Sequence, residues 1–120
     1  LMYLDIKNIT NRGDSLDDAY LKVVNRLDSL NFKMQEYYVI DDNMTLGRSS
    51  KNDIVIKDKF VSKNHLKIIV KNQGYYIEDL GSANGTFLNG MQVDPNELIE
   101  LQNNDKIGVG FIQFIFVDKR

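Results

Sequence analysis

Short runs of β-branched and aromatic residues, each ended by turn-forming residues, dominate the chain from residue 37 onward. Runs of this length and spacing are typical of strands, whereas helices need longer amphipathic stretches. The strongest local signal is Asn89-Gly90 between two apolar runs, because both positions of a two-residue hairpin turn require a positive φ. Lys71-Asn72-Gln73-Gly74 indicates a second hairpin turn. The pattern predicts an all-β sandwich of about ten or eleven mostly antiparallel strands, with the functional loops at one end.

The strands can be assigned along most of the chain from the apolar runs. We expect them at residues 37–40, 44–46, 54–56, 66–70, 75–80, 86–88, 91–93, 98–101, 105–109 and 111–117. Residues 16–30 fit two interpretations. Leu16, Tyr20 and Val23 follow helical spacing, whereas Tyr20-Leu21-Lys22-Val23-Val24 is rich in strand-forming residues. The residues alone leave helix and strand open for this segment.

Composition limits the class of protein. A chain of 120 residues is long enough for one domain with a sizeable core. The sequence contains no cysteine, which excludes disulfides and thiolate metal sites and fits a reducing, cytoplasmic setting. No apolar run approaches the roughly 20 residues that a membrane helix needs.

The charges are distributed unevenly along a chain whose net charge is −2. Residues 48–71 contain seven basic and two acidic side chains, whereas residues 72–105 contain six acidic side chains and no basic one. The first region is either a solvated lysine-rich face or a local attractor for an anionic ligand. The net negative charge argues against general nucleic-acid binding.

Three polar signatures interrupt the strands between residues 44 and 90. They are LGRSSKNDI at residues 46–54, VSKNH at 61–65 and DLGSANGTFLNG at 79–90. Together they supply a guanidinium (Arg48), a hydroxyl (Ser62), an ammonium (Lys63) and an amide (Asn84), with no nucleophile–base pair. Donors of this kind without a base suit the binding of an oxyanion rather than its chemistry. Arg48 could instead form a surface salt bridge with Asp53.

In this order, the three signatures resemble the forkhead-associated (FHA) domain family, a class of phosphothreonine-reading modules. The resemblance implies an FHA/SMAD-like β-sandwich whose first strand, expected near residues 20–25, pairs with the last. It implies that Arg48, Ser62 and Lys63 bind the phosphate and that Asn84 holds the peptide main chain. Residues that flank the ligand threonine would be read by three loops: the one around Ser49, Ser50 and Lys51, the one around Lys59 and Phe60, and the one around Ser82 and Ala83. Gly47, His65, Gly85 and Thr86 would support the site, and no catalytic residue, cofactor or metal is implied.

The single histidine cannot form a cysteine–histidine metal site, and His65 is expected to be a scaffold group. Asp79 and Asp105 are expected to stabilise turns rather than to bind metal. Ala83 departs from those family members that carry a polar side chain at this position, which leaves only its backbone for ligand contact. A phosphatase is disfavoured because one histidine, no cysteine and scattered aspartates offer no catalytic centre.

The functional prediction is a non-enzymatic, cytoplasmic module that recognises phosphothreonine-containing proteins or peptides made by a Ser/Thr kinase. The alternative is a module of the same fold that binds a protein without phosphate. We expect the domain to cover residues 19–120. Residues 1–18 are expected to be a linker or the remnant of an N-terminal region, with a membrane anchor of a cytosolic domain as one alternative. Neither nucleic-acid binding nor membrane insertion by this fragment is expected.

Overall fold

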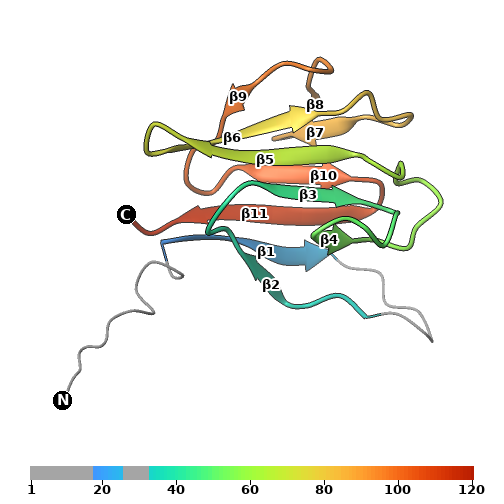
Figure 1. Ribbon diagram of the computed structural model, residues 1–120, viewed down its shortest axis with the longest axis horizontal. Coiled ribbons are helices and arrows are strands. Elements are labelled where there is room, and N and C mark those ends of the chain that lie inside the picture. The colour runs from blue at the N-terminus through green and yellow to red at the C-terminus, as the bar shows by residue number, and fades with distance from the viewer. Residues whose placement is uncertain (1–17, 26–32) are drawn as a thin grey trace.

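A computed structural model describes residues 18–25 and 33–120 of the chain. Within these residues, eleven strands form two sheets that pack face to face (Figure 1). The strands are β1 (Ala19–Asn25), β2 (Tyr37–Val39), β3 (Met44–Gly47), β4 (Ile54–Val55), β5 (Leu66–Lys71), β6 (Gly74–Asp79), β7 (Thr86–Leu88), β8 (Met91–Gln92), β9 (Ile99–Glu100), β10 (Lys106–Val109) and β11 (Ile112–Asp118). The predicted all-β sandwich is confirmed.

One sheet has six strands in the order β2-β1-β11-β10-β7-β8, and the other has five in the order β4-β3-β5-β6-β9. The pairing of β3 with β4 is parallel, and the other strand pairs are antiparallel. β1 lies against the last strand, from Ala19 opposite Asp118 to Asn25 opposite Gln113. The predicted pairing of first and last strands is therefore confirmed, and residues 19–25 are a strand. The other part of the ambiguous segment, residues 26–30, lies outside the described residues.

The core lies between the two sheets because alternate side chains of each strand point inward. Ile112, Phe114 and Phe116 of β11 are each at most 1% exposed, while the residues between them are partly exposed. The ring of Phe114 meets that of Tyr38 at a centroid distance of 6.4 Å, and Phe116 meets Tyr75 at 5.4 Å. Burying one such phenylalanine stabilises the fold by about 1.5–3 kcal/mol.

The apolar pattern of the sequence assigns twelve positions to the core, of which Leu80, Phe87 and Leu88 are only partly buried. The other nine are buried: Ile54, Ile56, Val61, Leu66, Ile68, Ile77, Ile107, Phe114 and Phe116. Leu80 lies at the start of a loop, so one side of it faces solvent. Leu88 still packs against the core.

Both predicted hairpin turns are present. Asn89 and Gly90 have φ values of 52° and 85° and connect Leu88 to its partner Met91. Asn72 and Gln73, at 51° and 63°, form the equivalent turn between β5 and β6. Strand ends differ more from expectation. The strand predicted at 98–101 is only two residues long, and Phe111 precedes β11 instead of beginning it.

The loops that follow β3, β4 and β6 gather at one end of the sandwich, on the right in Figure 1. The C-terminus lies at the opposite end. No helix capable of crossing a membrane occurs in the described ranges 18–25 and 33–120.

Candidate functional site

The loop that begins at Arg48 is fixed to the loop that follows β4. The backbone N–H of Arg48 donates to the Ser62 carbonyl at 2.9 Å, and that of Ser49 donates to the Lys63 carbonyl at 3.2 Å. The Arg48 Nε–H donates to the Val61 carbonyl at 2.9 Å. A guanidinium has five N–H donors, so four remain for a ligand.

Asp53 is not the partner of Arg48. Its Oδ2 atom accepts from the Thr45 backbone at 2.8 Å and also lies 3.3 Å from the Thr45 hydroxyl. Among the described residues, the structure records no ion pair between Arg48 and Asp53. Asp53 therefore does not compete with an anionic ligand for the guanidinium.

Asn52 and Gly47 hold the first two loops close together. The buried Asn52 amide donates to the Ser49 carbonyl at 2.9 Å and to the Lys63 carbonyl at 2.7 Å. A Cβ atom at Gly47 would lie 2.2 Å from the Lys63 carbonyl oxygen, so only glycine allows this approach. The sequence predicted the supporting role of Gly47 and gave no role to Asn52.

The His65 side chain connects the second and third loops. Its side chain is fully buried, and Nδ1 accepts the Ser62 backbone N–H at 3.0 Å. Because Nδ1 accepts, the ring proton sits on Nε2 and is donated to the Gly85 carbonyl at 2.9 Å. Burial lowers the pKa of His65, against the raising effects of the Gly85 carbonyl and of Asp79, so the ring is neutral at pH 7.

The Ser62 hydroxyl lies at the junction of the second and third loops. Its oxygen accepts the Ala83 backbone N–H at 2.9 Å. A hydroxyl that accepts one bond still has its own proton to donate. Ser62 can therefore donate to an anion beside Arg48, and Ala83 serves the site through its backbone.

The third loop is organised by the carboxylate of Asp79, which is 3% exposed. Oδ2 accepts the backbone N–H groups of Gly81 and Ser82, and Oδ1 accepts the hydroxyls of Ser82 and Thr86, each at 2.6 Å. Burial alone raises the pKa of Asp79, but these four hydrogen bonds outweigh it and leave the pKa below its ordinary value. The expected turn-stabilising role of Asp79 is confirmed.

Gly85 and Asn84 complete this loop. Gly85 has a φ of +92°, a conformation that side chains disfavour. The exposed Asn84 donates from Nδ2 to the Phe60 carbonyl at 3.0 Å. This bond leaves the Asn84 side-chain oxygen and its second N–H available to a peptide backbone.

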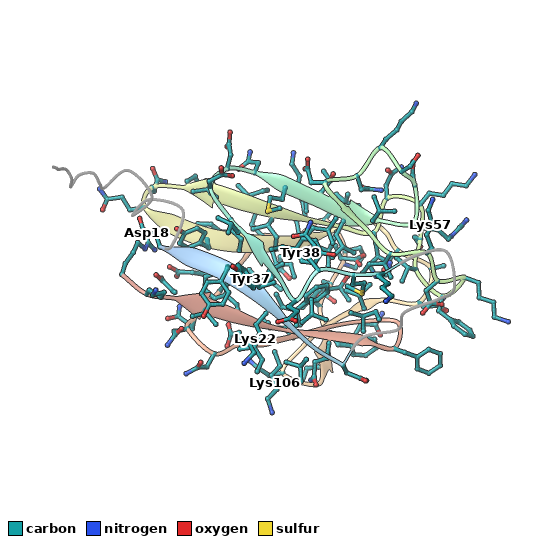
Figure 2. All side chains as sticks on the ribbon, turned by 90° about the horizontal axis from the view of Figure 1, so that it is seen from below. Asp18, Lys22, Tyr37, Tyr38, Lys57 and Lys106 are labelled. Carbon is teal, nitrogen blue, oxygen red and sulfur yellow. The ribbon has the colours of Figure 1, made fainter. Side chains whose placement is uncertain are left out.

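A basic hollow of about 590 Å³ opens where the first two loops meet, and its lining contains no acidic residue. Six residues line it: Arg48, Ser49, Ser50, Lys57, Lys59 and Lys63. The Lys57 ammonium donates to the Arg48 carbonyl at 3.2 Å. Figure 2 shows Lys57 at the loop end of the molecule, away from Asp18 at the other end. We call this feature the basic hollow.

The basic hollow brings together part of the predicted set. Arg48, Ser49, Ser50 and Lys63 line it, while Ser62 and Asn84 lie on loops bonded to it. Lys51 is exposed and outside its lining, and the Ser82 hydroxyl is engaged with Asp79. The sequence placed Lys59 in a loop expected to read residues beside the phosphothreonine, and this lysine does line the hollow. The sequence gave no role to Lys57, although the excess of positive charge across residues 48–71 was a signal for it.

An aromatic pair lies beside these loops. The rings of Phe60 and Phe111 meet edge to face at a centroid distance of 5.3 Å, and both side chains are exposed. Phe111 brings a fourth loop, the one between β10 and β11, next to the candidate site. Nothing in the sequence signalled this contact, because the two residues are far apart along the chain.

The FHA domain family model matches residues 44–110. An FHA domain-containing protein of Arabidopsis thaliana is 40% identical over 67 residues, which cover 56% of this chain and 17% of that protein. The chain spans about half or less of the length of the curated relatives that it matches.

Two solved structures extend the similarity to the whole sandwich. The FHA domain of the CT664 protein from Chlamydia trachomatis superimposes with a TM-score of 0.70 at 30% identity, covering 85% of this chain and 98% of that one. EmbR of Mycobacterium tuberculosis, solved with a low-affinity phosphopeptide, gives a TM-score of 0.70 at 26% identity, covering 83% of this chain and 24% of that one. The chain belongs to the forkhead-associated (FHA) domain family.

Proposed function

We propose that this domain binds phosphothreonine-containing proteins or peptides and performs no catalysis of its own. The observation that carries the proposal is the basic hollow, in which four cationic and two hydroxyl side chains meet without a carboxylate. A phosphothreonine carries about −1.5 to −2 charges near neutral pH, so this environment favours it strongly. The phosphopeptide bound to the related EmbR supports the same ligand class.

The phosphate would be held by Arg48, Ser62 and Lys63. Arg48 offers a planar fork of N–H donors that matches two phosphate oxygens, and its Nε contact with Val61 limits its motion. Ser62 donates its hydroxyl proton while the Ala83 N–H occupies a lone pair on the same oxygen. The Lys63 ammonium adds a third contact from the lining of the basic hollow.

The peptide backbone would be held by Asn84, whose link to the Phe60 carbonyl orients its amide. A preference for phosphothreonine over phosphoserine would need a niche for the extra methyl group of threonine. Burial of that methyl group would favour binding by on the order of 1 kcal/mol. Residues beside the phosphothreonine would contact Ser49 and Ser50 in the hollow, with Lys51, Ser82 and Ala83 at its margin.

The proposal includes a domain that covers residues 19–120. Its first and last strands, β1 and β11, pair along their length within one sheet, so both belong to the same domain. Residues 1–18 would act as a linker. The ligand is made by a Ser/Thr kinase, so we place the domain in the cytoplasm, alone or as the cytosolic part of a membrane-anchored protein. The absence of catalysis is supported by His65, whose two ring nitrogens are both engaged with backbone groups.

The test is fluorescence anisotropy with three matched degenerate peptide pools that carry phosphothreonine, phosphoserine or unmodified threonine. We expect saturable binding of the phosphothreonine pool and weaker binding of the phosphoserine pool. Equal binding of the phosphorylated and unmodified pools would favour the alternative, a phosphate-independent module of the same fold. Steady release of inorganic phosphate from the first pool would contradict the non-enzymatic assignment.

A further inference from the structure

The basic hollow carries more positive charge than one phosphothreonine neutralises. Arg48, Lys57, Lys59 and Lys63 all line it, and the lining offers no acidic partner to any of them. A phosphate that carries about two negative charges would leave about two positive charges unmatched. Cationic groups in one hollow repel each other, so a ligand with a second anionic group is favoured over one without it.

Lys57 and Lys59 are placed by contacts that leave their charges uncompensated. The Lys57 ammonium uses one of its three donors on the Arg48 carbonyl at 3.2 Å. The Lys59 ammonium lies 5.4 Å from the centroid of the Phe60 ring. Neither contact neutralises charge, and among residues 18–25 and 33–120 the structure records no carboxylate paired with either lysine.

The size of the basic hollow agrees with a second anionic group. Its volume of about 590 Å³ lies well within the range of pockets that hold whole small ligands, about 300–1,000 Å³. Arg48 and Lys63 are the phosphate-binding pair of the proposed function. Lys57 and Lys59 then remain as a separate pair within the same lining.

We propose that the basic hollow recognises phosphothreonine peptides that carry a second anionic group, which Lys57 and Lys59 bind. This inference rests on the proposed function and narrows its ligand class to peptides with an additional phosphorylated or acidic residue near the phosphothreonine. A second phosphate fits better than a single carboxylate because it brings about twice the charge.

The experiment compares phosphothreonine peptide pools in which one neighbouring position is fixed as phosphoserine, glutamate or alanine, with that position scanned along the peptide. Anisotropy should show the order phosphoserine, then glutamate, then alanine at one or two positions. The expected gain for phosphoserine over alanine is about three- to tenfold, the scale of partly exposed charge pairs. The gain should shrink as salt is raised from low to physiological strength.

Matched variants assign the effect to the two lysines. Lys57→Met/Lys59→Met should remove most of the preference while binding of the alanine pool changes much less. Lys22→Met/Lys106→Met removes the same charge from two exposed lysines of the six-stranded sheet, away from the loop end (Figure 2), and should keep the preference.

Three outcomes would overturn the inference. Equal affinity for the phosphoserine, glutamate and alanine pools, with phosphothreonine binding intact, would contradict the inference about a second anionic group. It would not contradict the proposed function. A preference that survives in Lys57→Met/Lys59→Met would place the second anion elsewhere. Stronger binding to phosphatidylserine vesicles than to the phosphoserine pool, lost in the same variant, would assign the lysines to a membrane surface. Failure of every phosphopeptide to bind would instead remove the proposed function itself.

Discussion

The backbone N–H of Ser62 donates to Nδ1 of His65 at 3.0 Å, so a buried imidazole stands directly behind the serine of the candidate phosphate site. The same ring donates from Nε2 to the Gly85 carbonyl at 2.9 Å. If Nδ1 were also protonated, its proton would face the Ser62 N–H. The hydrogen bond from Ser62 to His65 would then be lost, because Nδ1 could no longer accept it. The arrangement of two binding loops thus depends on a neutral histidine.

The first prediction is a loss of stability in mild acid. Burial lowers the folded-state pKa of His65 below its ordinary value of 6.5. Between these two pKa values the unfolded chain binds a proton that the folded chain does not, so the free energy of unfolding rises with pH. The contribution is fully present above pH 6.5 and is lost as the pH falls below it, at about 1.4 kcal/mol per pH unit at most. Urea unfolding at several pH values from 7.5 to 5 measures this slope.

The control for that slope is His65→Asn. This variant should be less stable at pH 7.5, because the link to Gly85 is lost, but its stability should not decline between pH 6.5 and 5. A decline of equal size in both proteins would show that another group is responsible.

The second prediction concerns Asp79→Asn. The carboxylate accepts three hydrogen bonds from the loop that precedes β7 and a fourth from Thr86, the first residue of β7. An amide places an N–H group against donors, so the variant should lose about 2–4 kcal/mol of unfolding free energy. Asp94→Asn, at an exposed position, should cost little. Equal stability of the two variants in urea unfolding would contradict the role assigned to Asp79.

The acid response of Asp79 differs from that of His65. Its folded-state pKa lies below the ordinary value of 3.8, so its contribution is present above that pH and is lost as the pH falls through the folded-state pKa. The loss from His65 therefore begins near pH 6.5 on acidification, whereas the loss from Asp79 begins only near pH 3.8.

The third prediction is the intolerance of Gly47 to a side chain. A Cβ atom there would lie 2.2 Å from the Lys63 carbonyl oxygen and 2.8 Å from the Asn52 amide nitrogen. Gly47→Ala should therefore push the first two loops apart, cost about 1–3 kcal/mol of stability and weaken phosphopeptide binding. At Gly108 the nearest atom would be 3.5 Å away, an ordinary contact, so Gly108→Ala is the matched control. Similar affinity and stability of the two variants would contradict this account.

The strands could be predicted from the sequence because their signals are local. Asn89-Gly90 fixes a turn through its own φ preferences, and the apolar alternation of residues 112–116 marks a buried strand wherever it lies. Strand ends were less predictable. Phe111 looks like strand sequence, but Gly110, with a φ of +58°, turns the chain immediately before it.

Only those residues of the site that belong to a recognisable sequence motif could be predicted. The three signatures identified Arg48, Ser62 and Asn84, and the structure places them on loops that are bonded together. Lys57 and Asn52 could be assigned a place in the site only from the distances between loops in the structure. Asn52 looks like an ordinary turn residue until its amide is seen to bridge two carbonyl groups from different loops.

The central claim is that Arg48 binds the phosphate of a phosphothreonine peptide, and the most direct test is the affinity of Arg48→Met for the phosphothreonine pool. The variant removes the fork of N–H donors, and loss of such a charged partner should cost about 2–5 kcal/mol, at least about a thirtyfold weaker affinity. Lys106→Met, which removes one exposed charge on the six-stranded sheet, should bind as the unmodified protein does. If folded Arg48→Met bound the pool with unchanged affinity, the phosphate would not be held where we place it.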